Sequence, residues 1–168
     1  MLAAAGLIRR LACLAYEALL LTALLFIASF LLLPLVSRGH AAGASALTLP
    51  DLPARTMLFC ALFAIAAAYF TWCWTGGRRT LPQKTWRLRI VAHDERAPDY
   101  RRAFVRYLAA WIGPALALVT YVTMKPYGLA GVALVPLALN YLAAFVDPER
   151  QFLHDRVAGT RVVQAALV

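Results

Sequence analysis

A glutamate interrupts the longest apolar run in the chain. The stretch "RRLACLAYEALLLTALLFIASFLLLPLV" begins at Arg9, and Glu17 lies seven residues after Arg10. Seven residues are two helical turns, so the side chains of Arg10 and Glu17 would share a helix face, about 10 Å apart along the axis. A charge at the centre of a membrane helix costs about 2.5–3.5 kcal/mol, so an ionisable group there is a functional candidate.

Glu17 has three physical possibilities. It pairs with a cation or polar group from another helix, it lines a wet cavity, or it is protonated. Arg10 can extend toward lipid headgroups, whereas Glu17 lies too deep to reach water easily. A polar contact that fixes helix packing and a role in handling a proton or cation therefore both stay open.

Two histidine–aspartate neighbours, His93-Asp94 and His154-Asp155, could supply acid–base chemistry. The chain has no Gly-x-Ser-x-Gly, His-Glu-x-x-His or phosphate-loop motif. Such neighbours are then more often hydrogen-bonded surface or packing groups, so we expect no enzyme and no catalytic residues. The cysteines lie in apolar segments without metal-ligand spacing, and we expect reduced, packed thiols with no metal or cofactor: Cys13, Cys60 and Cys73.

The composition is that of a membrane protein. Of 168 residues, 62% are hydrophobic and 15% are charged, whereas about a quarter are charged in a soluble domain. A net charge of +9 would favour nucleic-acid binding if the basic residues formed one face of a soluble fold. Here they lie between apolar runs, so we expect contacts with anionic lipid headgroups and no nucleic acid.

The elements that position these groups are apolar runs near the length of about 20 residues that a membrane helix needs. Four spans are predicted, at residues 11–36, 57–75, 105–124 and 127–146. Only Lys125 and Pro126 separate the last two, which predicts a tight hairpin, and Pro114 and Pro136 should kink them. The expected fold is a single all-α membrane domain over residues 1–168, a bundle of four transmembrane helices.

Basic residues set the expected orientation. The segment 76–106 carries nine of them, and four spans place it on the same side as both ends of the chain, with 14 of the 17 basic residues. That side is cytoplasmic by the positive-inside rule. A cleaved signal peptide is the alternative for the first span, with "HAAGASA" as the cleavage region, but the apolar run exceeds the usual 7–15 residues.

The segments outside the spans predict a small cytoplasmic element of strands and short helices. Alternation over residues 86–91 indicates a strand with a basic face, and Asp99 is a candidate helix cap. In the tail, Asp147 followed by proline predicts a helix start and Gly159 a helix end. "TRVV" has strand composition and is expected to pair with "RLRIV". The tryptophans are expected near the membrane interface: Trp72, Trp74, Trp86 and Trp111.

Several motifs give the chain a resemblance to a known family. They are "RRLACLAYE" at the first span, "YFTWCW" and "LPQKTWRLRIV" around the end of the second, and "DPERQFLHDRVAGTRVV" in the tail. With these the chain resembles the RDD family of small bacterial membrane proteins, over nearly its whole length except the first loop. The resemblance implies the bacterial cytoplasmic (inner) membrane, a multi-pass topology, and transport, including cation–proton exchange in some members.

The resemblance also implies site residues. The family arginine corresponds to Arg10, its first aspartate to Glu17, and its second to Asp147 or Asp155, of which we favour Asp155. Glutamate at 17 keeps the charge on a longer arm. Gln83 stands where the family commonly has glycine, which departs from a glycine-dependent turn.

We therefore expect a transport or ion-coupling component. The alternative is a non-catalytic membrane scaffold that binds another protein through its basic cytoplasmic segment. Because few polar groups lie within the spans, a transporter would need a homo-oligomer or a membrane-protein partner. The candidate functional residues are Arg10, Glu17, Asn140, Asp147, His154, Asp155 and Arg156.

Overall fold

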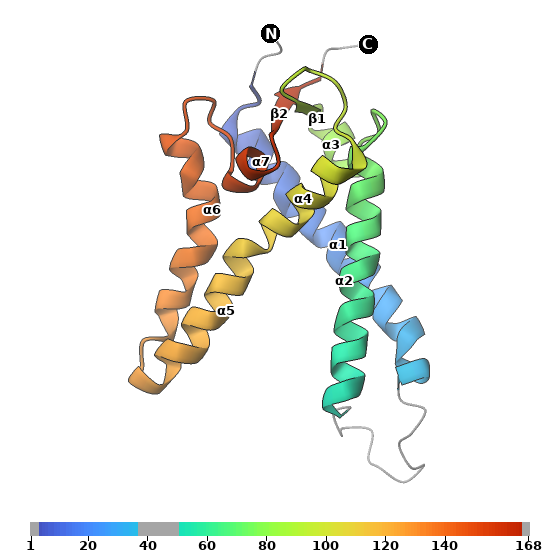
Figure 1. Ribbon diagram of the computed structural model, residues 1–168, viewed down its shortest axis with the longest axis vertical. Coiled ribbons are helices and arrows are strands. Elements are labelled where there is room, and N and C mark those ends of the chain that lie inside the picture. Colours follow the sequence, from blue (N-terminus) through green and yellow to red (C-terminus); the bar gives the residue numbers. More distant parts are fainter. Residues whose placement is uncertain (1–3, 37–50, 166–168) are drawn as a thin grey trace.

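The computed structural model describes residues 4–36 and 51–165, and it is mostly helical (Figure 1). The α-helices are α1 (Leu7–Val36), α2 (Leu52–Trp74), α3 (Leu81–Thr85), α4 (Tyr100–Ala110), α5 (Ile112–Met124), α6 (Leu134–Val146) and α7 (Leu153–Val157). Two 3-10 segments, η1 (Lys125–Tyr127) and η2 (Ala130–Ala133), connect α5 to α6, and the strands are β1 (Leu88–Ala92) and β2 (Thr160–Gln164). The predicted loop with Arg38 and the "HAAGASA" region lies largely outside the described residues.

Three stretches are long and apolar enough to cross a bilayer: Leu7–Pro34, Leu52–Trp74 and Tyr100–Tyr127. This confirms a helical protein of membrane type. The fourth predicted span is represented by a shorter apolar helical stretch, Ala130–Val146. Its α-helix begins only at Leu134, so Pro136 lies in the first turn, where its missing N–H removes no helical hydrogen bond.

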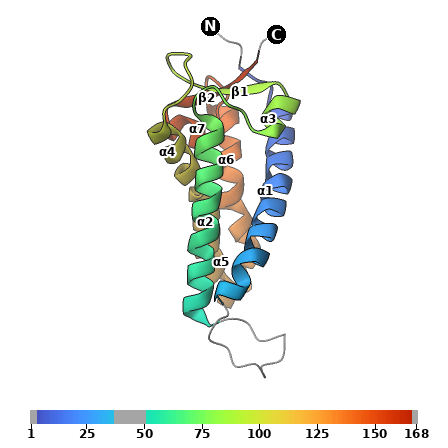
Figure 2. The same cartoon turned by 90° about the vertical axis from the view of Figure 1, so that its right-hand side faces the viewer.

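The long helices form two pairs. α1 packs on α2, as Figure 2 shows, and α5 packs on α6. The two pairs diverge away from the end that carries the strands (Figure 1). α4 runs obliquely from the α2 side toward α5 and contacts both α2 and α7. The break between α4 and α5 falls at Trp111, three residues before Pro114, which cannot donate a helical hydrogen bond. The oblique α4 thus joins the two pairs.

The strands confirm the expected pairing. β1 and β2 are antiparallel, with Leu88 opposite Gln164 and Ala92 opposite Thr160. The backbone N–H of Ala5 donates to the carbonyl of Val162, 3.3 Å away, so the segment before α1 joins the same layer. The prediction of a basic outer face on β1 was wrong. Val91 is fully buried and Arg89 is half-buried, because the small sheet is covered on both faces.

Of the three helix ends predicted from the sequence, two were correct and one was wrong. Asp99 caps α4 by accepting the N–H of Arg102 at 2.8 Å, as expected. Gly159 follows the end of α7 with a φ of 62°, also as expected. The helix start at Asp147 was wrong. Asp147 ends α6, and Arg150 has a φ of 53°, which interrupts any helix before α7.

One interior prediction needs correction. Trp74 is buried in the core and stacks on Phe70 with ring centroids 4.7 Å apart, whereas Trp72 is exposed. All three cysteines are free, but Cys60 is exposed on α2 instead of packed. Hydropathy alone does not separate a side chain facing lipid from one facing a neighbouring helix.

Candidate functional site

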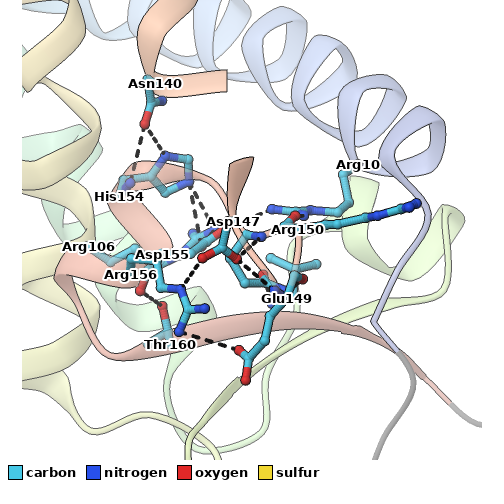
Figure 3. Close-up of polar contacts among 12 residues, drawn as sticks. Arg10, Arg106, Asn140, Asp147, Glu149, Arg150, His154, Asp155, Arg156 and Thr160 are labelled. Atoms are coloured by element: carbon cyan, nitrogen blue, oxygen red, sulfur yellow. Dashed lines mark hydrogen bonds and ion pairs between the residues drawn. The ribbon is translucent and has the colours of Figure 1, made fainter. Parts of the chain in front are cut away.

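A buried carboxylate lies at the centre of the charged cluster shown in Figure 3. Asp155 is fully buried, and one of its oxygens, Oδ1, accepts from Nε of Arg106 at 2.8 Å. Its other oxygen, Oδ2, accepts from Nη2 of Arg10 at 3.0 Å. Burial acts to raise the pKa of Asp155, but the guanidiniums of Arg106 and Arg10 outweigh it and hold the pKa below its ordinary range. The carboxylate is therefore ionised at neutral pH.

Arg10 connects the start of α1 to the tail. Its guanidinium also donates to the backbone carbonyl of Arg150, and it stacks on Phe152, 3.9 Å from the ring centroid. Only 2% of Arg10 is exposed. Arg106 pairs with the same carboxylate from α4, so two buried arginines hold Asp155. Arg10 belongs to this cluster and makes no ion pair with Glu17 among the described residues.

The neighbouring His154 is neutral. Oδ1 of Asn140 accepts the backbone N–H of His154 at 3.2 Å and contacts ring Nδ1 at 3.1 Å. Since this oxygen can only accept, Nδ1 carries the proton. Nε2 is then free to accept from Arg106 at 3.4 Å. Burial, helped by the positive charges of Arg106 and Arg10, lowers the pKa of His154 to about 4. The negative charge of Asp155 acts in the opposite direction.

Glu17 contacts a different part of the chain. Its Oε1 accepts from the hydroxyl of Thr80 at 2.6 Å, and Oε2 makes no hydrogen bond within the described residues. The same Thr80 hydroxyl accepts from the backbone N–H of Gln83, whose side chain accepts from the N–H of Thr80. This capping box fixes α3 and thereby the group that holds Glu17. Gln83 therefore has a defined capping role in this turn.

Two cavities adjoin Glu17. The smaller, about 20 Å³, lies between Glu17, Arg10 and Arg106, and it is large enough for a single water molecule. The larger, about 220 Å³, also reaches Glu17 and Arg106 and extends to Asn140 and His154. Glu17 therefore has a polar partner outside its own helix, and it also lines a cavity. These are two of the three possibilities left open by the sequence.

Asp147 and Arg156 form a separate pair nearer the surface. Oδ1 of Asp147 accepts from Nε of Arg156 at 2.6 Å, while Oδ2 accepts the backbone N–H groups of Glu149 and Gln151. Partial burial acts to raise the pKa of Asp147, but these bonds lower it below its ordinary value. The pair stabilises the turn between α6 and α7 and is more exposed than Asp155; its residues are labelled in Figure 3.

Sequence reasoning missed two members of the site. Arg106 was interpreted as one of several lipid-facing cations, yet it lay inside the predicted span 105–124, where a charge needs a partner. Thr80 carried no such signal, because nothing in the local pattern places it beside Glu17, 63 residues away. Among the described residues, no group of three His, Cys, Asp or Glu side chains is positioned to hold a metal ion.

The apolar helices, with polar groups gathered at one end, are typical of an α-helical membrane protein. The model of the RDD family matches residues 4–159, so the chain belongs to the RDD family. Comparison with curated proteins and with solved structures finds no match.

Proposed function

We propose that the protein is a transport or ion-coupling component of the bacterial cytoplasmic membrane, in which Glu17 binds and releases a proton. One observation carries the proposal. Glu17 lies in an apolar helix, has one carboxylate oxygen without a partner in the described chain, and borders two cavities. A carboxylate that served only to fix helix packing would be expected to have both oxygens bonded.

The proposed topology has four spans, with both ends of the chain in the cytoplasm. In support, the segment before α1, the strands and α7 lie at one end of the molecule, and the α5–α6 turn lies at the other (Figure 1). The first of these ends carries most of the basic residues, which favours the cytoplasm. For the fourth span, the stretch Ala130–Val146 would cross the bilayer as a short, partly 3-10 helix.

We propose no enzymatic role. Both oxygens of Asp155 are held by arginines, and both ring nitrogens of His154 have partners, so this pair is not available for acid–base catalysis.

A scaffold function is the second candidate. The segment 76–106 leaves several cations exposed, and these could bind an acidic surface of another protein: Lys84, Arg87, Arg96, Arg101 and Arg102. Anionic lipid headgroups are the other partner that we propose for them.

The test uses purified protein in liposomes with imposed pH and cation gradients, together with a size measurement in mild detergent. We expect proton movement that requires the protein. Absence of flux together with co-purification of one stoichiometric partner would contradict the proposal and favour the scaffold.

A further inference from the structure

The larger cavity has the lining of a binding site. It measures about 220 Å³, below the roughly 300 Å³ at the lower end for drug-sized ligands. Aromatic side chains from three helices form much of its wall: Phe70, Trp74, Tyr107, Trp111 and Tyr141. Glu17, Arg106, Asn140 and His154 also border it. A small ligand with an apolar or aromatic body and one polar group fits a cavity with one aromatic wall and a few polar side chains.

Three side chains on the cavity carry N–H groups that have no acceptor among the described residues. Trp74 is only 6% exposed, and its Nε1–H has no hydrogen-bond partner in the described chain. Arg106 uses Nε and Nη2 for Asp155 and His154, which leaves Nη1 without a described partner. Asn140 uses only its oxygen, toward His154. A buried donor without an acceptor is costly, so Nε1 of Trp74 favours a ligand that accepts a hydrogen bond, and the N–H groups of Arg106 and Asn140 lie on the same cavity.

The charges restrict the ligand further. Arg10 and Arg106 face the single carboxylate of Asp155, and the neutral His154 adds no charge. With its carboxylate ionised, Glu17 would balance the charge of the second arginine. A bound anion beside Arg106 would neutralise the charge of that arginine instead. The anion and an ionised Glu17 would then repel each other unless Glu17 took up a proton.

Several polar or titratable groups face Glu17, and Arg10 and His154 line the same cavities. Thr80 donates to it, Arg106 on α4 and Asp155 on α7 interact with it electrostatically, and Cys73 and Tyr69 on α2 lie near it. Cys13 lies one turn earlier on α1 and also interacts with it. Of these, only Glu17 itself is expected to change its charge when an anion binds beside Arg106.

We infer that this cavity binds a small organic acid as its monoanion, and that Glu17 takes up one proton from solution as the anion binds. The carboxylate of the ligand accepts from Arg106, Asn140 and Trp74, and its apolar body lies against the aromatic wall. No covalent bond forms or breaks in the ligand. This inference rests on the proton-binding role proposed for Glu17 and names the solute that accompanies the proton.

Titration calorimetry of the detergent-purified protein tests the inference, with empty micelles as the blank. The probes are benzoate, benzyl alcohol and benzylamine, which share a ring and differ in charge. Benzoate titrations in buffers of different ionisation heat count the protons taken up. We expect benzoate to bind at least tenfold more tightly than either other probe, with close to one proton taken up. Preferred binding of benzylamine, or benzoate binding without proton uptake, would overturn the inference.

Matched variants locate the site. Trp74→Phe keeps an aromatic ring but removes the N–H donor that lacks an acceptor, and should weaken benzoate binding about tenfold. Trp72→Phe, two residues away on the exposed side of α2, should leave it unchanged. Glu17→Gln should bind benzoate without proton uptake. Equal effects of the two tryptophan changes would contradict the placement.

The result is separable from the proposed function. Proton flux without benzoate binding would refute the ligand class alone. Benzoate binding with proton uptake but without flux would support the site and refute transport.

Discussion

The carboxylate of Asp155 accepts from two arginines that come from different helices, 145 and 49 residues away in the chain. A buried ion pair gives little net stability relative to a well-packed apolar core, because both charges lose their hydration. Removing one partner is different, since the other charge is then left buried and uncompensated. The cluster therefore selects one docking arrangement of the tail against α1 and α4.

Replacement of Asp155 by Asn should lower the free energy of unfolding by about 3–5 kcal/mol, because Arg10 and Arg106 would remain buried without their counter-charge. Thermal or denaturant unfolding in detergent measures this. Asp147→Asn is the matched control. Asn can still accept the backbone N–H groups, and the lost partner, Arg156, is 37% exposed, so the cost should stay below about 1 kcal/mol. Equal costs for the two variants would contradict the central position of Asp155.

Acid should destabilise the protein through His154. The pKa of His154 is about 4 in the folded protein against an ordinary 6.5, so the unfolded chain binds more protons between these values. Stability contributed by the neutral imidazole is complete above pH 6.5 and falls by about 3 kcal/mol as pH approaches 4. Asp155 contributes little in this window, because its pKa lies below 3.8.

Unfolding measured at several pH values in the wild type and in His154→Gln checks this. The wild type should lose more stability than the variant between pH 6.5 and pH 4. Parallel pH profiles for the two proteins would show that His154 is not held neutral by the fold.

Among the helices, the close approach of α5 to α6 depends on Gly113. A Cβ atom there would lie 3.3 Å from the backbone carbonyl oxygen of Pro136 and 3.9 Å from Cβ of Asn140. Gly113→Val should therefore push the two helices apart and cost about 1–3 kcal/mol in unfolding free energy. Gly131→Val, where the added Cβ has open space, is the control and should cost less. Similar unfolding midpoints would contradict the tight α5–α6 contact.

Local sequence signals predicted elements well where the chemistry is local. Asp99 before α4, Gly159 after α7 and the alternation in β1 each act within a few residues, and each was confirmed as an element boundary or strand. The tail after Asp147 shows the limit. Aspartate and proline satisfy a helix start, but the same carboxylate can bond a turn, and Arg150 then adopts a positive φ. Sequence alone did not decide between them.

The site was predictable only in part for a related reason. Resemblance placed Arg10 and Asp155, but nothing in the spacing indicated that Arg106 would share their contact or that Thr80 would reach Glu17. The apolar spans give no strong pattern of one packed face, since lipid and protein neighbours accept the same side chains. The contact between α1, α4 and α7 therefore depends on tertiary packing, which the local sequence pattern does not show.

For the whole molecule, orientation is the first matter to test. Reporters fused after residue 168 or inserted within residues 80–100 should be cytoplasmic. Those inserted at Gly128 or within residues 40–52 should be external, because four spans alternate the sides. Activity of paired cytoplasmic and periplasmic reporters measures this. An external carboxyl end would overturn the four-span topology.

The central claim is that Glu17 carries a proton and does not only hold helices together. Proton flux in liposomes, compared for the wild type, Glu17→Asp and Glu17→Gln at equal reconstitution, tests it most directly. Asp keeps the titrating group, whereas Gln keeps hydrogen bonding to Thr80 but cannot exchange a proton. We expect flux in the wild type and in Glu17→Asp and none in a normally assembled Glu17→Gln. Flux in Glu17→Gln equal to the wild type would contradict the claim and leave Glu17 as a packing contact.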